Sequence, residues 1–134
     1  MLFRSLLHDY GHFILENPDD LVSKRKDGKH EDVGYEFLKK YFVKNVVEPI
    51  KYHVKAKRYL ARDVKYYRVL SEASKVSLKL QGGIMDDKEA KEFQVSEFFE
   101  DSIKLRKFDE GAKKADLKIK SINEYKNLLS SKLI

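Results

Sequence analysis

The 134-residue sequence contains no cysteine and no tryptophan, and only two prolines and six glycines. Without cysteine the chain forms neither disulfides nor thiolate metal sites. Histidine, aspartate and glutamate are then the only strong metal ligands that remain. Any metal site in this sequence therefore has to be built from imidazoles and carboxylates.

Long apolar runs are also missing. No stretch reaches the roughly 18 apolar residues of a membrane span, and no basic segment followed by an apolar one indicates a signal peptide. We therefore expect no membrane association and a cytoplasmic protein. With 42% hydrophobic residues, the chain is long enough for one core, so residues 1–134 are predicted to form a single domain.

Positive charge is in excess, with a net charge of +6 and a pI near 9.3. Basic surfaces attract nucleic acid through its phosphates. Here, however, the basic clusters are diluted by nearby acidic residues, and no nucleic-acid-binding signature accompanies them. Solvated helix faces explain such charges, so nucleic acid is not expected as a partner. A small anionic substrate would use only two or three of these cations.

The apolar spacing favours helices throughout, which predicts an all-α bundle. The segments expected to be helical are 2–16, 30–42, 46–60, a short one after the Asp86 and Glu89 capping pair, 97–115 and 121–133. Pro49 is expected in a first turn, which would move the start of the third segment close to Glu48. Residues 63–67 suggest a turn with a short element, and residues 70–80 leave helix and strand open.

The chain is organised around the stretch Leu6-Leu7-His8-Asp9-Tyr10-Gly11-His12. Two imidazoles four residues apart share one face of a helix, and the carboxylate of Asp9 borders that face. A glycine inside a helix costs stability. Gly11 therefore suggests that another part of the chain approaches closely at this point.

All four histidines lie in the first 53 residues, and His30 and His53 join the pair already named. A lone histidine on a helix is most often structural or solvated. As a set with Asp9 in an apolar bundle, however, these imidazoles suit zinc, iron or manganese. A carboxylate next to one histidine can also bridge two cations.

These residues resemble the HD-domain superfamily of metal-dependent phosphohydrolases, and within it the oxygenase branch. That branch holds mixed-valence diiron enzymes that cleave 1-hydroxyphosphonates oxidatively, with myo-inositol oxygenase as a more distant relative. The similarity covers about residues 1–115 and implies an HD-domain helical bundle. It is carried by the HD stretch and by four further phrases, His30-Glu31-Asp32-Val33-Gly34, His53-Val54-Lys55-Ala56-Lys57-Arg58-Tyr59-Leu60, Ser77-Leu78-Lys79-Leu80-Gln81-Gly82-Gly83 and Leu105-Arg106-Lys107-Phe108-Asp109.

The resemblance implies a metal-binding protein with two irons. His8, Asp9 and Asp109 would be ligands of one metal. Asp9, His30 and His53 would be ligands of the other, so that Asp9 forms the bridge. For Asp109, which precedes Glu110 in a charged helix, a solvated position is the alternative.

The same resemblance assigns residues to the substrate. The positions that match the family's phosphonate-binding residues are His12, Lys57, Ser74, Ser77 and Arg106. Among them, His12 and Lys57 are expected to be catalytic. A phosphonate dianion needs charge-assisted donors, and Lys57 lies one turn beyond His53 on the same helix face. Surface positions are the alternative for the two cations and the two serines.

One departure from the family pattern concerns the first ligand. The family places a histidine on a helix ahead of the HD helix, whereas only seven residues precede His8 here. We therefore expect either a longer natural chain or a depleted first metal site. An absent first helix would also leave Leu2, Phe3, Leu6 and Leu7 uncovered, which favours a homodimer.

Three functions remain open at this point. The first is a diiron oxygenase that uses dioxygen to cleave the C–P bond of a 1-hydroxyphosphonate with release of phosphate. The second is phosphohydrolase activity on a phosphate ester by a metal-bound hydroxide. The third is an inactive remnant of either, which the incomplete ligand set supports.

Overall fold

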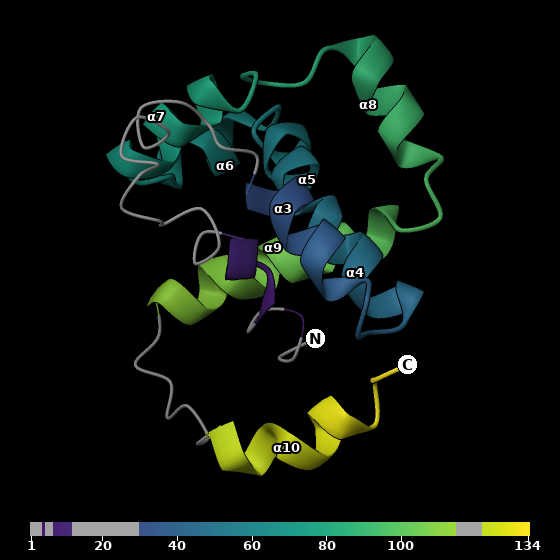
Figure 1. The fold of residues 1–134 in the computed structure, drawn as a ribbon. Helices are drawn as coiled ribbons and strands as arrows, with labels where there is room; N and C mark the ends of the chain where they lie inside the picture. The colour runs from purple at the N-terminus through teal and green to yellow at the C-terminus, as the bar shows by residue number, and fades with distance from the viewer. Residues whose placement is uncertain (1–3, 5–6, 12–29, 115–121) are drawn as a thin grey trace, which may run out of the picture.

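A computed structural model describes residues 4, 7–11, 30–114 and 122–134 of the chain. Within these residues the fold is helical, and the only β-type pairing found there is an isolated bridge between Phe42 and Leu133. The prediction of an all-α bundle is confirmed (Figure 1). The helices are α3 (His30–Leu38), α4 (Lys44–Lys51), α5 (His53–Leu60), α6 (Val64–Val69), α7 (Glu72–Leu80), α8 (Asp87–Gln94), α9 (Phe99–Lys114) and α10 (Ile122–Ser130).

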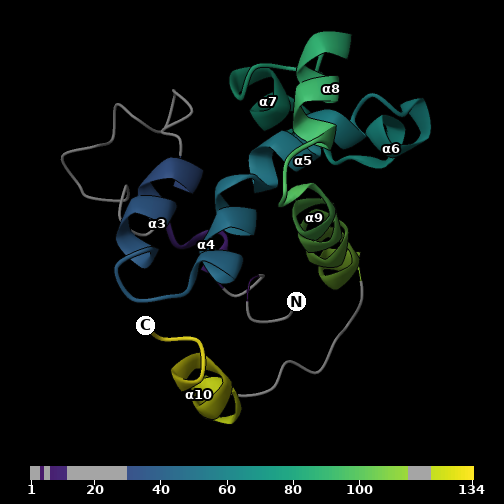
Figure 2. The ribbon, with the colours of Figure 1, turned by 90° about the vertical axis from the view of Figure 1, so that its right-hand side faces the viewer.

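The apolar core is divided into three clusters of buried side chains. The largest joins α3, α4 and α9 through Leu38, Val46, Val47, Ile50 and Leu105. A second connects α5 with α8, and a third connects the end of α5 with α6 and α7. Helix α5 packs along α9, and α3 packs on α4, as Figures 1 and 2 show from two sides. The helices that supply the predicted site residues therefore belong to one packed unit.

The N-terminal segment is described at Arg4 and at residues 7–11, where His8 and Asp9 form a turn between the helical residues Leu7 and Tyr10. Leu7 and Tyr10 pack against the largest core cluster. Most of the helix predicted over residues 2–16 lies outside the described residues, and so do Leu2, Phe3 and Leu6 of the proposed dimer surface. Leu7 itself is covered within the chain, and the homodimer stays a prediction.

Gly11 lies directly against the backbone of α3. A Cβ atom placed on Gly11 would lie 1.7 Å from the carbonyl oxygen of His30 and 2.9 Å from the backbone nitrogen of Gly34. No side chain fits in this space, because both neighbours are backbone atoms. The close approach expected from the sequence is therefore present. It sets the turn formed by His8 and Asp9 (the HD turn) beside the first residue of α3.

The predicted helix over residues 46–60 is wrong in one respect, because the chain forms two helices that meet at Tyr52. Helix α4 begins at Lys44, so Pro49 lies inside it rather than in its first turn. A proline within a helix removes one backbone hydrogen bond. Here Val46, Val47 and Ile50 are buried in the largest core cluster, and this burial favours the helix despite the lost bond.

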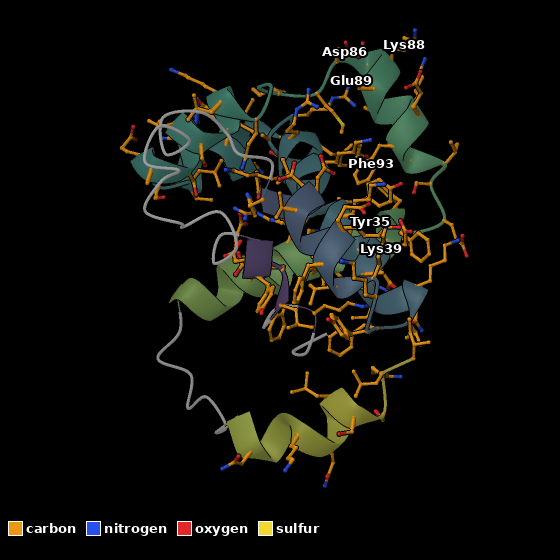
Figure 3. All side chains as sticks on the ribbon, viewed as in Figure 1. Tyr35, Lys39, Asp86, Lys88, Glu89 and Phe93 are labelled. Carbon is orange, nitrogen blue, oxygen red and sulfur yellow. The ribbon has the colours of Figure 1, made fainter. Side chains whose placement is uncertain are left out.

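The remaining helices agree with the sequence apart from their ends. Residues 72–80 are a helix, which resolves the open choice for that segment. Asp86 and Glu89 form the expected capping box at the start of α8, where Figure 3 labels both side chains. Helix α3 ends at Leu38 instead of Phe42, and α10 ends at Ser130 instead of Leu133. The capping residue predicted at Ser121 lies outside the described residues.

The Gly11 contact predicts the effect of a single methyl group. We expect Gly11→Ala to lower the free energy of unfolding by about 2 to 3 kcal/mol, because the backbone of α3 has to move away. Gly111→Ala is the matched control, since nothing lies within 4 Å of its added Cβ. That change should be neutral or stabilising by up to about 1 kcal/mol. Equal denaturant midpoints for Gly11→Ala and the unchanged chain would contradict the close packing.

Candidate metal centre

Five of the predicted site residues converge from four parts of the fold. His8 and Asp9 come from the N-terminal turn, His30 and His53 are the first residues of α3 and α5, and Asp109 lies in α9. All except Asp9 are buried. Residues more than 100 positions apart in the chain thus share one small volume.

The two oxygens of the Asp9 carboxylate face different partners. Its Oδ2 atom lies 3.2 Å from Nε2 of His8. Its Oδ1 atom lies 3.5 Å from Nε2 of His30 and 3.9 Å from Nε2 of His53. Burial opposes ionisation of Asp9, but the hydrogen bond and charge of His8, and then the charges of His53 and His30, hold its pKa well below the usual range. Asp9 is therefore an ionised carboxylate between two sets of nitrogen atoms.

His8 lies between two carboxylates, because its Nε2 atom is also 3.4 Å from Oδ1 of Asp109. Burial by itself would lower the pKa of His8. The hydrogen bonds to Asp109 and Asp9 outweigh that effect and raise the pKa to about 9. In the absence of a metal ion, the His8 imidazole is therefore protonated and positively charged.

His53 is oriented by a backbone carbonyl. Its Nδ1 atom lies 2.5 Å from the carbonyl oxygen of Ile50, and because a carbonyl only accepts, Nδ1 carries the proton. Burial and the charges of His8 and His30 lower the pKa of His53 to about 3, so the ring is neutral. Its Nε2 atom therefore presents a lone pair, 3.0 Å from Nε2 of His30. A hydrogen bond from the other ring nitrogen, such as the one from Nδ1 to the Ile50 carbonyl, commonly fixes the tautomer of a metal-binding histidine.

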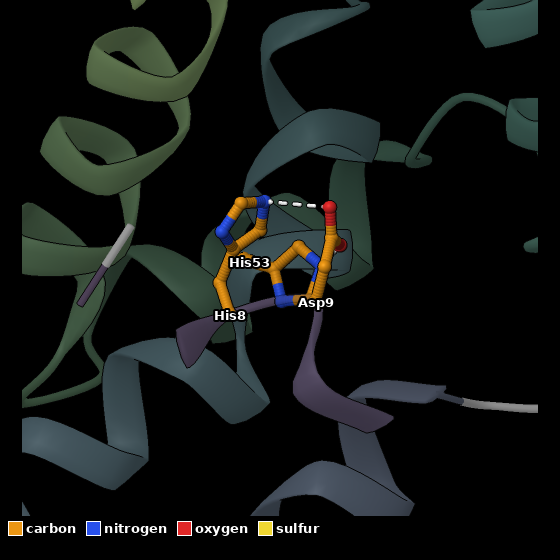
Figure 4. Close-up of side chains that lie close together, drawn as sticks. All are labelled: His8, Asp9 and His53. Atoms are coloured by element: carbon orange, nitrogen blue, oxygen red, sulfur yellow. Dashed lines mark ion pairs between the residues drawn. The ribbon is translucent and has the colours of Figure 1, made fainter. Parts of the chain in front are cut away.

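The donor set fits a metal ion. One ligand atom each from His8, Asp9 and His53 lie within 4.8 Å of one another, and Figure 4 shows these three side chains converging. Nitrogen and carboxylate oxygen are the donors that iron, zinc and manganese accept. The cluster therefore has the donor atoms that a metal centre needs, and a bound metal ion would replace the positive charge that His8 otherwise supplies.

A cavity of about 140 Å³ opens beside this cluster. His8, Asp9, His30 and His53 form one wall, and the rest of the lining includes the predicted substrate residues Lys57, Ser74, Ser77 and Arg106. The Nζ atom of Lys57 donates to Oγ of Ser77 at 2.6 Å and to Oε1 of Gln81 at 3.2 Å. The structure thus brings two cations and two hydroxyls to the same cavity as the predicted metal ligands. His12, the remaining predicted substrate residue, lies outside the described residues.

Arg106 is held by three neighbours. Its Nη2 atom pairs with Oε1 of Glu110 at 2.7 Å, its Nη1 atom lies 3.5 Å from Oδ2 of Asp109, and its Nε atom donates to the hydroxyl of Tyr66 at 3.3 Å. Tyr66 in turn donates to Glu110 at 2.5 Å. Burial alone would lower the pKa of Arg106, but these partners raise it. The guanidinium is therefore charged and fixed in orientation.

Sequence reasoning did not identify Gln81, Glu110 or Tyr66. Gln81 shares a helix face with Ser74 and Ser77, and Glu110 lies four residues after Arg106, so helical spacing could have found both. Tyr66 is 40 residues from Arg106, and no local pattern points to it.

In the part of the chain that the structure describes, no helix has the length and apolar character needed to cross a membrane.

Residues 63–67, where a turn with a short element was expected, contribute to α6, which is a short helix with no buried residue. Helix α6 nevertheless contributes to the site, because the hydroxyl of Tyr66 accepts a hydrogen bond from Nε of Arg106.

Two proteins named as phosphonate dioxygenases are similar to this chain over most of its length. A hydroxymethylphosphonate dioxygenase from Gimesia maris is 43% identical over 123 residues, which cover 90% of this chain and 61% of the relative. A [1-hydroxy-2-(trimethylamino)ethyl]phosphonate dioxygenase (glycine-betaine-forming) from Leisingera caerulea is 43% identical over 114 residues, covering 84% and 58%. The chain is thus similar in sequence to about three fifths of each of two phosphonate dioxygenases. The resemblance to the oxygenase branch inferred from the sequence is thereby confirmed.

An uncharacterized protein from Acanthamoeba polyphaga mimivirus is also similar, with 36% identity over 132 residues that cover 96% of this chain and 60% of that protein. The chain thus spans about three fifths of the length of each of these three relatives, the two phosphonate dioxygenases and the viral protein. No protein-family model matches the chain.

The geometry of His53 generates a direct test. We expect His53→Ala to weaken metal binding at least tenfold, because it removes a neutral, oriented nitrogen donor. Lys55→Ala is the matched control, since Lys55 is exposed on the same helix. Metal content after dialysis against a weak chelator, measured by plasma emission spectroscopy, compares the two. Unchanged metal content in His53→Ala would contradict the role of His53 as a ligand.

Proposed function

We propose that this chain holds the iron centre of an oxygenase that cleaves the C–P bond of a 1-hydroxyphosphonate and releases phosphate. The relationship to phosphonate dioxygenases supports this activity. The observation that carries the proposal is that the two oxygens of the Asp9 carboxylate face different partners. One oxygen faces His8, and the other faces His30 and His53.

We infer two metal positions from this arrangement of the Asp9 oxygens. His8, Asp9 and Asp109 would hold one iron, and Asp9, His30 and His53 would hold the other. Asp9 would then bridge the two ions, as carboxylates do in sites with two metals. When bound, the irons supply the dioxygen chemistry by which the hydroxyl-bearing carbon is oxidised.

The phosphonate group would lie in the 140 Å³ cavity beside the cluster. Lys57 and Arg106 bring two positive charges to a dianion, and Ser74 and Ser77 add hydroxyl donors. Lys57 is buried, so its ammonium acts in an environment where little water competes for the anion. These residues would fix the substrate with its hydroxyl-bearing carbon next to the metal ligands, and we also retain His12 as a proposed substrate residue.

The proposal is tested on protein purified without oxygen and loaded with Fe²⁺. We expect two irons per chain, and release of phosphate from hydroxymethylphosphonate only when dioxygen is admitted. Phosphate release from a phosphate monoester without dioxygen would overturn the proposal in favour of hydrolysis. Absence of stoichiometric metal would overturn both activities and identify an inactive relative.

Lys57 gives a second test that does not depend on turnover. Lys57→Met removes the charge while nearly preserving side-chain volume, and we expect orthophosphate to bind about tenfold or more weakly, because a charge-assisted hydrogen bond is lost. Lys55→Met, an exposed position on the same helix, should bind orthophosphate as the unchanged chain does. Calorimetric titration of the metal-loaded protein measures both. Equal affinities for the two variants would exclude Lys57 from the anion site.

A further inference from the structure

We propose that Arg4 is a positioning residue for the metal centre, because it clamps the HD turn to α4 and α9. Its role toward the metal depends on the proposed function, whereas the clamp itself does not. A single nitrogen of its guanidinium, Nη2, contacts both helices, and the side chain is mostly enclosed, with 16% of its surface exposed.

The contact with α4 compensates for Pro49. In a regular helix the carbonyl of Asn45 accepts a hydrogen bond from the backbone nitrogen four residues later. That residue is Pro49, which has no N–H to donate. Nη2 of Arg4 donates to the carbonyl oxygen of Asn45 at 2.6 Å. The proline inside α4 thus leaves an acceptor that the N-terminal segment uses as its attachment point.

The contact with α9 is an ion pair. Nη2 of Arg4 lies 3.0 Å from Oδ2 of Asp101, in the first turn of α9. The same helix carries Arg106 and Asp109 of the site, five and eight residues further on. Arg4 therefore links the segment that supplies His8 and Asp9 to the helix that supplies Asp109.

His8 and Asp9 lie between two anchors. Arg4 is four residues before His8 and is fixed to α4 and α9, while Gly11 is two residues after Asp9 and lies against the backbone of α3. Ligand distances in a metal site tolerate only a few tenths of an ångström. A turn fixed at both ends meets that demand, whereas a turn fixed only at Gly11 can move away from Asp109.

The experiment compares three variants with the unchanged chain. Arg4→Met removes both contacts, and Arg68→Met is the control because Arg68 is exposed on α6. The double variant Arg4→Met with Pro49→Ala restores a backbone N–H for the carbonyl of Asn45 without restoring the clamp. Thermal unfolding of the metal-free protein and titration with Co²⁺, followed by its visible absorption, are measured for each.

We expect Arg4→Met to lower the Tm by roughly 3 to 5 °C, and to lower it by less in the presence of Pro49→Ala. The affinity for Co²⁺ should fall about tenfold in Arg4→Met and stay low in the double variant, with a changed absorption spectrum. Arg68→Met should match the unchanged chain. Co²⁺ affinity that is unchanged in Arg4→Met, or fully recovered in the double variant, would overturn the positioning role. Failure of the unchanged chain to bind Co²⁺ would instead overturn the metal centre of the proposed function, and with it any role of Arg4 toward a metal.

Discussion

The carboxylate of Asp9 is the group on which the rest of the arrangement depends. Imidazoles from three separate segments lie within 3.9 Å of its two oxygens. Asp9 itself is half exposed, whereas the imidazoles around it are buried. A buried charge is costly unless it is paired, and the Asp9 carboxylate supplies that pairing. The helices are accordingly placed so that α3 and α5 each begin with a histidine at this carboxylate, and α9 brings a second carboxylate to His8.

Two backbone contacts contribute to the geometry of this cluster. Gly11 lies on the carbonyl of His30, and the carbonyl of Ile50 at the end of α4 orients His53 at the start of α5. Main-chain atoms cannot change rotamer, so they hold ligands more rigidly than flexible side chains would. The junction of α4 and α5 at Tyr52 is therefore part of the site, although Tyr52 is not among the predicted ligands.

The sequence indicated which side chains gather at the cluster better than it indicated the backbone around them. Local patterns indicated the His8 and Asp9 pair and the helical spacing of His53 and Lys57. They also indicated the close backbone approach at Gly11. The break at Tyr52 was not, because burial of Val46, Val47 and Ile50 decides the position of α4 and overrides the usual place of Pro49. Tyr66 was equally inaccessible, since it meets Arg106 only through tertiary packing. His12 and the ends of the first predicted helix lie outside the residues that the structure describes.

The distribution of the cluster along the chain has a thermodynamic consequence. Its members lie between residues 8 and 109, so an unfolded chain cannot present them together. A cation that binds only the assembled cluster stabilises the whole fold by mass action, in proportion to the logarithm of its free concentration. The survival of such a protein against proteolysis would then follow the metal supply of the cell, so that scarcity of the metal would remove the protein as well as its activity.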